Sequence, residues 1–228
     1  MKRITESVLL LVVCASLVLI FLSGSGWIEP VKAKMQASQV NKSWLLAAPD
    51  KALLHSGDII FRHGRGFISN AFLKFSLKDP RYSHAGIIEI ENGNIFVYHC
   101  IGGEENKSNK MKKESLAEFC RADRIHSFGI FRTDLGKEAL AKIRNEVQAF
   151  YSNGLEFDTD FDLRSDNKMY CTEMVYKLLQ DASGDKNYIP LTHVSGRTFV
   201  SCDNIYLSHH CTGIYSYNYQ NLSSNLRQ

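Results

Sequence analysis

The fold is decided by residues 83–100, SHAGIIEIENGNIFVYHC. Two runs rich in β-branched and aromatic residues flank Asn92-Gly93, and an Asn-Gly pair supplies the positive φ angles that a tight hairpin turn needs. We therefore predict two antiparallel strands joined by this turn. His84 begins the first strand and His99 ends the second, so the two side chains should be opposite or one step apart, with Cβ atoms about 5 Å apart.

Short strands and amphipathic helices alternate around this hairpin. The hairpin strands are expected at 83–90 and 94–100, further strands at 57–62, 128–132 and 155–163, and helices at 67–77, between a cap at Asp134 and a stop at Gly154, and at 170–180. Residues 104–113 are charge-mixed and predict a loop, and the tail from Tyr188 has no clear periodicity. Because helices and strands are intermixed without a strict β-α-β order, the predicted class is α+β.

The amino terminus has the pattern of a targeting segment. Lys2 and Arg3 precede an apolar run, Val8 to Leu22, which is long for a signal peptide and short for a membrane helix, so both interpretations stay open. We expect a signal peptide or membrane anchor at 1–28, a linker at 29–52 with a short helix near 43–48, and one folded domain at 53–228. The positive flank favours an exported or membrane-anchored, extracytoplasmic protein, in the periplasm or cell envelope if the source is bacterial.

Composition excludes several classes. The chain has 228 residues, of which 44% are apolar and 22% charged, with a formal charge of +3, as expected for a folded globular protein. Without the first six residues, 25 basic and 23 acidic residues leave only +2, which disfavours a nucleic-acid partner. The expected membrane contact is through the amino-terminal segment, and no cofactor is predicted.

Cys171 is the strongest candidate for chemistry because it begins a predicted helix. The unpaired N–H groups and the helix dipole at that position lower a thiol pKa, and the thiolate is the reactive form. A thiolate also needs a base and an orienting group, which His84 and His99 could supply. The alternative interpretation is that Cys171 is a small buried hydrophobe and the histidines are polar strand ends.

Three motifs in order strengthen the catalytic interpretation. They are Gly57-Asp58-Ile59-Ile60, Ser83-His84-Ala85-Gly86-Ile87 and Tyr170-Cys171-Thr172-Glu173. With them, the chain over about residues 53–182 resembles the circularly permuted branch of the NlpC-type papain-fold cysteine hydrolases, the YiiX/YaeF-like group. The resemblance implies an antiparallel sheet packed with helices, a Cys171 nucleophile and a His84 base.

One position departs from that family pattern. The third catalytic residue is often a glutamate in a Tyr-Glu-Ala-like stretch, and the aligned stretch here is Tyr98-His99-Cys100. His99 is therefore the expected orienting residue, and Asp58 or Glu89 would replace it only if the fold brings either near His84. Tyr170 and Asp58 are the expected substrate-binding residues, although the Tyr170 phenol could instead simply pack.

The implied function is hydrolysis of an amide or ester bond, in a cell-envelope peptide or a lipid acyl substrate. Two alternatives remain open: a non-catalytic lipid- or peptide-binding module on the same fold, and a zinc site built from His84, His99 and Cys171. Three aromatic residues of the predicted helix at 67–77 could line an acyl-binding groove or belong to the core: Phe67, Phe72 and Phe75.

The other cysteines suggest disulfides, and a lysine cluster suggests a lipid contact. In an oxidising compartment Cys202 could pair with Cys211, and Cys100 with Cys120. Four lysines in the predicted loop could contact anionic lipid headgroups or simply be solvated: Lys107, Lys110, Lys112 and Lys113.

Overall fold

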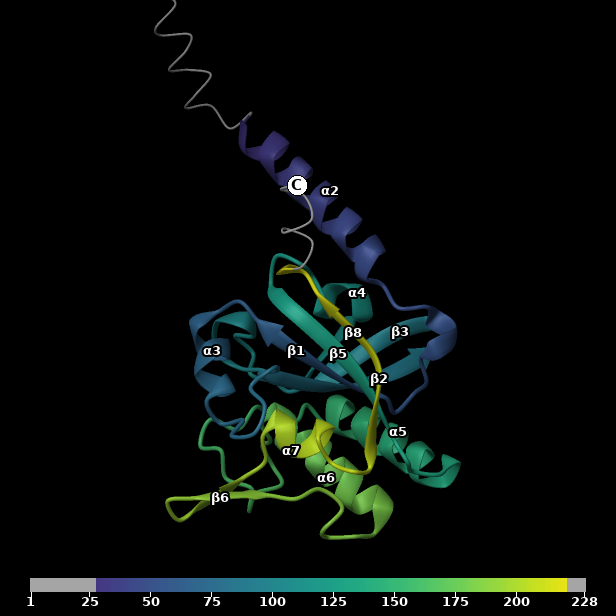
Figure 1. Ribbon diagram of the computed structural model, residues 1–228, viewed down its shortest axis with the longest axis vertical. Coiled ribbons are helices and arrows are strands. Elements are labelled where there is room, and N and C mark those ends of the chain that lie inside the picture. The colour runs from purple at the N-terminus through teal and green to yellow at the C-terminus, as the bar shows by residue number, and fades with distance from the viewer. Residues whose placement is uncertain (1–27, 221–228) are drawn as a thin grey trace, which may run out of the picture. The chain divides into compact units, whose positions relative to one another are not determined.

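The computed structural model describes residues 28–220, apart from the side chains of residues 28–32 and 104. The apolar run of the predicted signal or anchor segment lies outside the described residues. The chain divides into two units, Met1–Leu45 and Leu46–Gln228, and the second is the compact body that carries the sheet (Figure 1).

The first described element is a 20-residue helix, α2 (Ile28–Ala47). A helix is thus present where the short helix near 43–48 was expected, but it begins at Ile28 and covers most of the expected linker. Within residues 28–220, no helix combines the length and the apolar character that crossing a bilayer requires.

A six-stranded antiparallel sheet organises the compact unit, in the order β4-β3-β2-β1-β5-β8 (Figure 1). Its strands are β1 (Ile59–Gly64), β2 (His84–Glu91), β3 (Asn94–His99), β4 (Lys112–Ser115), β5 (Ile125–Thr133) and β8 (Cys211–Asn218). The helices are α3 (Phe67–Leu73), α4 (Leu116–Phe119), α5 (Lys137–Ser152), α6 (Cys171–Ser183) and α7 (Cys202–Tyr206), with short 3-10 helices η1 (Lys51–Leu53) and η2 (Gly103–Glu105) and a small hairpin, β6 (Thr192–Val194) and β7 (Arg197–Phe199). The predicted antiparallel sheet packed with helices is confirmed.

The β2–β3 hairpin forms as predicted. Asn92 and Gly93 have φ angles of 51° and 77°, and the strands pair from Ile87 opposite Tyr98 to Glu91 opposite Asn94. Since side chains alternate along a strand, this register puts His84 and His99 on the same face of the sheet.

The opposite face packs against α5 and α6, which lie beneath the sheet in Figure 1. Alternate strand residues interdigitate there with the apolar stripes of the helices: Phe61, Ala85, Ile87, Ile143, Val147, Met174 and Leu178. The helix predicted at 170–180 is confirmed, and Gly184 ends it in the left-handed conformation with φ 70°.

The strand predicted at 155–163 is wrong. Instead, the buried carboxylate of Asp158 accepts the backbone N–H groups of Asp160 and Asp162, at 2.8 and 2.7 Å, and so holds a loop. Only Glu156 makes isolated bridges, to Lys110 and Lys168. The apolar-polar alternation reflects this local side-chain bonding, which competes with a sheet ladder.

Other helix and strand boundaries differ from the predicted ones because of local contacts. Gly136, and not Asp134, precedes the first turn of α5, because the Asp134 carboxylate accepts from the Tyr188 hydroxyl at 2.6 Å and lies 2.8 Å from His210 Nδ1. The predicted loop at 104–113 runs into β4, and α3 ends at Leu73.

The five described cysteines are free, so neither suggested disulfide is present.

Gly86 tests how tightly the hairpin is packed. A Cβ at this position would lie 2.6 Å from Val97 Cγ1 and 2.9 Å from the Tyr98 carbonyl oxygen. The carbonyl oxygen is a backbone atom, so it cannot move aside without a cost in free energy. Gly86→Ala should therefore lower the free energy of unfolding by roughly 1–3 kcal/mol in urea titrations. Gly136→Ala, where a Cβ meets nothing within 4 Å, is the control. Equal stability of the two variants would contradict the packing described here.

Candidate active site

Three buried side chains form a chain of contacts across β2, β3 and β4. His84 Nε2 lies 2.8 Å from His99 Nδ1, and His99 Nε2 lies 3.4 Å from Glu114 Oε2. His99 is fully buried, His84 is 9% exposed, and the Glu114 side chain is 8% exposed. The β3–β4 register sets His99 opposite Lys112 and Val97 opposite Glu114, so His99 and Glu114 are diagonal neighbours on one face.

The order of donors along this chain follows from the carboxylate. The Glu114 carboxylate only accepts, and neither Glu114 Oε2 nor His99 Nε2 forms a hydrogen bond among the described residues, so each faces only the other, at 3.4 Å. We assign the hydrogen to His99 Nε2, the nitrogen that faces the carboxylate, so that Nδ1 of a neutral His99 accepts. His84 Nε2–H is the donor to it, which leaves His84 Nδ1 as a free base.

Burial decides the charge of each member. Loss of water lowers the pKa of His84 well below 6.5, and the positive charges of Arg62 and Lys112 act in the same direction. Burial lowers the pKa of His99 to about 4, although Glu114 opposes the shift. Burial alone would raise the pKa of Glu114, but its contacts with His99 and Lys112 outweigh this and hold it well below its usual range. At neutral pH the chain of contacts therefore consists of two neutral imidazoles and one carboxylate, which His99 alone contacts.

Phe119 of α4 and Arg62 of β1 enclose the imidazoles. The Phe119 ring stacks on His84 at 5.8 Å between centroids and meets His99 edge-on at 5.1 Å. Arg62 is directly opposite His84 in the β1–β2 register, lies 4.5 Å from the centroid of Phe119, and donates to the Phe119 carbonyl at 3.2 Å and to Glu105 at 3.0 Å. This buried cation disfavours a second positive charge on His84.

Cys171 is the first residue of α6 and is half-buried. Before it, the Tyr170 N–H donates to the buried Glu173 carboxylate at 3.1 Å, which completes the first helical turn. Burial raises the pKa of the Cys171 thiol, and the backbone N–H groups of Ala85 and Thr172 offset this only in part. The thiol pKa is thus raised and not lowered as predicted, because desolvation outweighs the N–H groups at the helix start.

The backbone of Ala85 lies between the Cys171 thiol and His84. Ala85 follows His84 in β2, and its N–H lies near the Cys171 sulfur. The described residues show no hydrogen bond from the sulfur to either imidazole. The structure therefore brings His84 and His99 together directly, and places Cys171 beside the residue that follows His84.

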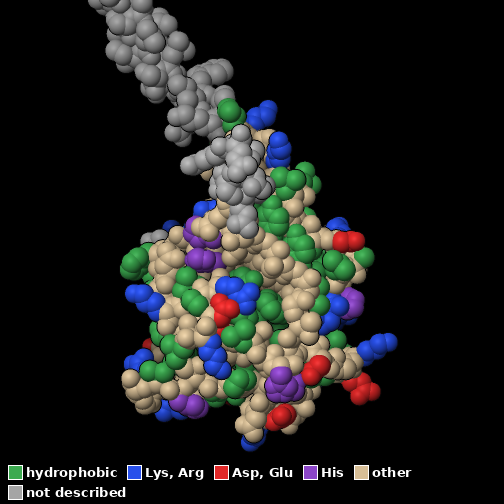
Figure 2. Space-filling view, in the orientation of Figure 1, with side chains coloured by type: hydrophobic (Ala, Val, Ile, Leu, Met, Phe, Trp, Pro, Cys, Tyr) green, Lys and Arg blue, Asp and Glu red, His purple; other side chains and the backbone are tan. Residues whose placement is uncertain are grey.

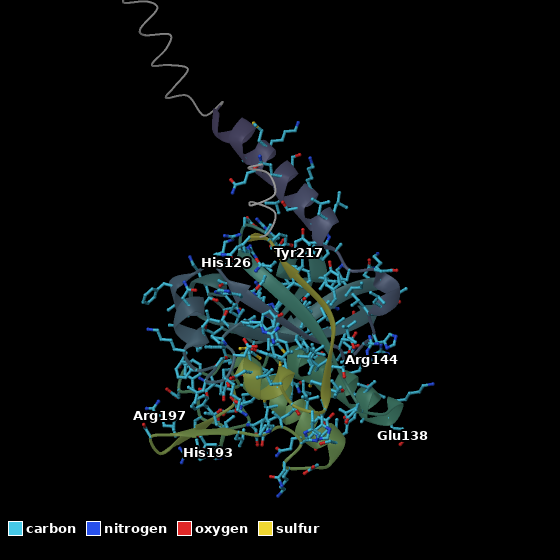
Figure 3. All side chains as sticks on the ribbon, viewed as in Figure 1. His126, Glu138, Arg144, His193, Arg197 and Tyr217 are labelled. Carbon is cyan, nitrogen blue, oxygen red and sulfur yellow. The ribbon has the colours of Figure 1, made fainter. Side chains whose placement is uncertain are left out.

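The remaining predicted site residues lie elsewhere. The Tyr170 hydroxyl accepts the Val200 N–H at 3.0 Å in a buried position. Asp58 directly precedes β1, and its carboxylate accepts two 2.7 Å hydrogen bonds from the Arg132 guanidinium. Its role in substrate binding stays a prediction. Glu89 binds Arg144, labelled in Figure 3, at 2.8 Å. Neither carboxylate replaces His99 beside His84.

Glu114 is the residue that the sequence did not reveal. It lies just past a segment expected to be a loop, and β4 has only four residues, too few for a period-two pattern to stand out. Its nearest signal is its position before the Ser115-capped helix α4, which does not indicate which strand it joins.

Comparison with known proteins places this chain in a family. The family model described as "Permuted papain-like amidase enzyme, YaeF/YiiX, C92 family" matches residues 53–195. The chain belongs to this family. The resemblance drawn from the three motifs is thereby confirmed, and with it a relationship to papain-like amidases.

Two YiiX proteins of Escherichia coli are similar to the chain. "Uncharacterized protein YiiX" of strain K12 is 26% identical over 131 residues, 57% of this chain and 59% of that protein, so the chain spans about three fifths of this relative. The crystal structure of YiiX from strain O157:H7, titled a metalloprotein (DUF1105), matches with a TM-score of 0.57 at 20% identity, covering 72% of this chain and 97% of that one. At that identity the match shows a shared fold.

The described residues do not fit a metal centre. Within 28–220 no group of three or more His, Cys, Asp or Glu side chains is arranged to hold an ion. His84 Nε2 and His99 Nδ1 point at each other at hydrogen-bond distance, which leaves no space for a metal between them. The zinc alternative built on His84, His99 and Cys171 therefore finds no support in this geometry.

The buried imidazoles make stability depend on pH. Between pH 6.5 and about 4 the unfolded His99 binds a proton that the folded one does not, so stability falls as the pH falls. For His99 alone, the free energy of unfolding measured in urea titrations should fall by roughly 2 kcal/mol between pH 6.5 and pH 5. His99→Gln should reduce this loss. The exposed His193, labelled in Figure 3, provides the control His193→Gln, and an equal pH dependence in both variants would refute the assignment.

Proposed function

We propose that the protein is a thiol hydrolase that cleaves amide or ester bonds, with Cys171 as nucleophile and His84 as base. The main support is the Glu114–His99–His84 chain, which leaves a free base nitrogen on the residue next to Ala85, whose N–H lies near the Cys171 sulfur. Membership in a family of papain-like amidases supports the same chemistry.

The resting pair is neutral, so proton transfer accompanies attack. When a carbonyl carbon reaches the sulfur, His84 Nδ1 takes the thiol proton as the C–S bond forms and the carbonyl π electrons move to oxygen. The charge on His84 is stabilised through Nε2–H donation to His99, which in turn donates to Glu114. His84 then returns the proton to the leaving amine or alkoxide, and a water molecule, deprotonated by His84, cleaves the thioester.

The start of α6 is suited to the developing oxyanion. The N–H groups of Cys171 and Ala85 both lie near the sulfur, and a tetrahedral intermediate would place its oxygen within this region. The Tyr170 hydroxyl already accepts the Val200 N–H, which favours a packing role for this side chain.

The substrate class follows from the proposed location. An exported or membrane-anchored enzyme meets cell-envelope peptides and lipid acyl groups, and both contain bonds that this mechanism cleaves. The rival proposal, a non-catalytic binding module on the same fold, predicts ligand binding without turnover.

An acyl-enzyme test separates catalysis from binding. With a p-nitrophenyl ester, the wild type should release p-nitrophenol in a burst and gain the mass of one acyl group, because the thioester forms before it is hydrolysed. Cys171→Ala should show neither signal in stopped-flow absorbance and intact-protein mass spectrometry, while retaining the wild-type circular dichroism spectrum. Acylation of folded Cys171→Ala, or no acylation of the wild type by any ester or amide tested, would refute the proposal.

Glu114→Gln tests the proton chain. Loss of the carboxylate removes the charge that stabilises protonated His84, so kcat should fall by roughly 10- to 100-fold while KM changes little. Because the pKa of His84 is lowered, the wild-type kcat/KM should decline only well below pH 6.5, and this decline should move in the variant. Glu138→Gln, at an exposed residue of α5 labelled in Figure 3, should keep both parameters. An unchanged pH profile in Glu114→Gln would show that the carboxylate is only structural.

A further inference from the structure

Helix α3 exposes its apolar side chains. No residue of α3 is buried, although the helix is apolar, and the exposed fractions of Phe67 and Ile68 are 85% and 65%. In the segment that follows, Phe75 is 50% exposed and Leu77 is 62% exposed. Large apolar side chains that are exposed close together in the sequence often mark a binding site. The interpretation of these aromatic residues as core is therefore wrong for Phe67 and Phe75, whereas Phe72 is partly buried.

Four aromatic rings connect this surface with the candidate nucleophile. Phe75 is 5.9 Å from Phe72, Phe72 is 5.4 Å from Phe161, and Phe161 is 5.3 Å from Tyr170, the residue that precedes Cys171 (centroid distances). We call these four residues the aromatic row. It begins at a half-exposed ring and ends at the start of α6, so it is continuous with the proposed site.

The loop at Phe161 is built to hold a ring in this row. Phe161 has a φ of 55°, in the left-handed region, which costs a non-glycine residue about 1–2 kcal/mol. The two hydrogen bonds from residues 160 and 162 to the buried Asp158 flank Phe161 and maintain that conformation. The strained residue is also 36% exposed, so burial of its ring does not explain the strain.

The charges around the aromatic row are of both signs, since Asp160 and Asp162 flank Phe161 while basic residues accompany α3. Between Ile59 and Lys78 the sequence contains four basic residues and no acidic residue. Arg65, Lys74 and Lys78 are exposed, and none forms an ion pair in the described part of the chain. Figure 2 shows hydrophobic side chains beside Lys and Arg side chains in the region where Figure 1 places α3. Such a surface is suited to an apolar chain that contacts the rings while the charged side chains beside them stay in water.

From these observations we infer that the aromatic row binds the acyl chain of a lipid, and that the bond cleaved at Cys171 joins that acyl group to the rest of the lipid. This inference rests on the proposed function and selects lipid acyl groups over cell-envelope peptides. The acyl chain would extend along the row from its carbonyl carbon at the Cys171 sulfur toward Phe75, so its distal end would lie beside α3.

A chain-length series tests the inference. For p-nitrophenyl esters from acetate to decanoate, kcat/KM of the wild type should rise with chain length, because each methylene placed on the row is removed from water. Phe75→Ser and Phe161→Ser should lower kcat/KM for the decanoate at least tenfold and leave the acetate within about twofold. Leu53→Ser is the matched control, since Leu53 is 47% exposed on η1, and it should retain the wild-type series.

A binding measurement separates this inference from the proposed function. In full-length Cys171→Ala, which cannot turn over, a fluorescent polyene fatty acid should bind at least tenfold more tightly than in Cys171→Ala/Phe75→Ser, and Cys171→Ala/Leu53→Ser should match the parent. Because each protein carries the same amino-terminal segment, a contribution from that segment cancels.

The outcomes differ for the two claims. Acylation of the wild type with no dependence on chain length would overturn the lipid acyl inference and leave the hydrolase proposal standing. Binding of the fatty acid at the row with no acylation by any ester or amide would support the acyl-chain site and overturn the hydrolase. Equal loss of acetate and decanoate hydrolysis in Phe75→Ser would show a structural defect and count against the acyl-chain site.

Discussion

The burial of two imidazoles and a carboxylate under one face of the sheet is the constraint on which the site depends. An unpaired buried polar group is costly, so each member needs the next one at the correct position. The β2–β3 register sets the two histidines, the β3–β4 register sets Glu114 diagonal to His99, and Phe119 fixes both rings from α4. A one-residue slip in either register would move a member to the other face of the sheet, so the proton chain and the strand pairing stabilise each other.

The same burial changes what activates the thiol. At an exposed helix start, the N–H groups and dipole would favour a thiolate. At the start of α6, loss of water raises the pKa of the Cys171 thiol and lowers that of His84, so both effects favour the neutral pair. The positive charge of Arg62 opposes a proton on His84 but favours a negative sulfur. In the proposed mechanism, proton transfer from Cys171 to His84 would therefore accompany attack, because the resting pair is neutral.

Local signals predicted the parts of this site that depend on local structure. Asn92-Gly93 and the alternation around it were sufficient to predict the hairpin and the meeting of His84 with His99, and the amphipathic stripe behind Cys171 was sufficient to predict α6. Glu114 was not predictable in this way, because its position depends on which strand a four-residue segment joins. The strand expected at 155–163 failed for a related reason: one carboxylate, Asp158, satisfies backbone groups that the periodic pattern assigned to a ladder. The raised thiol pKa also depends on tertiary packing, which sequence spacing does not reveal.

Chain order is not a constraint on a site of this kind. The proposed base comes from a strand that precedes the nucleophile's helix by more than eighty residues, the reverse of the order expected for an unpermuted papain-like chain. The proposed chemistry requires only that the start of β2 lies close to the start of α6. The packing of α6 against β2 brings them together, with Ile87 of β2 and Met174 of α6 in one apolar core. The segments between these two elements are then free to serve other purposes. The loop at 156–163 is such a segment: it adds nothing to the sheet, yet its buried Asp158 and strained Phe161 extend an aromatic surface from α3 to the residue before the thiol. A fold that fixes the reacting groups by strand register and helix packing can therefore vary the surface that leads to them without disturbing the reaction centre.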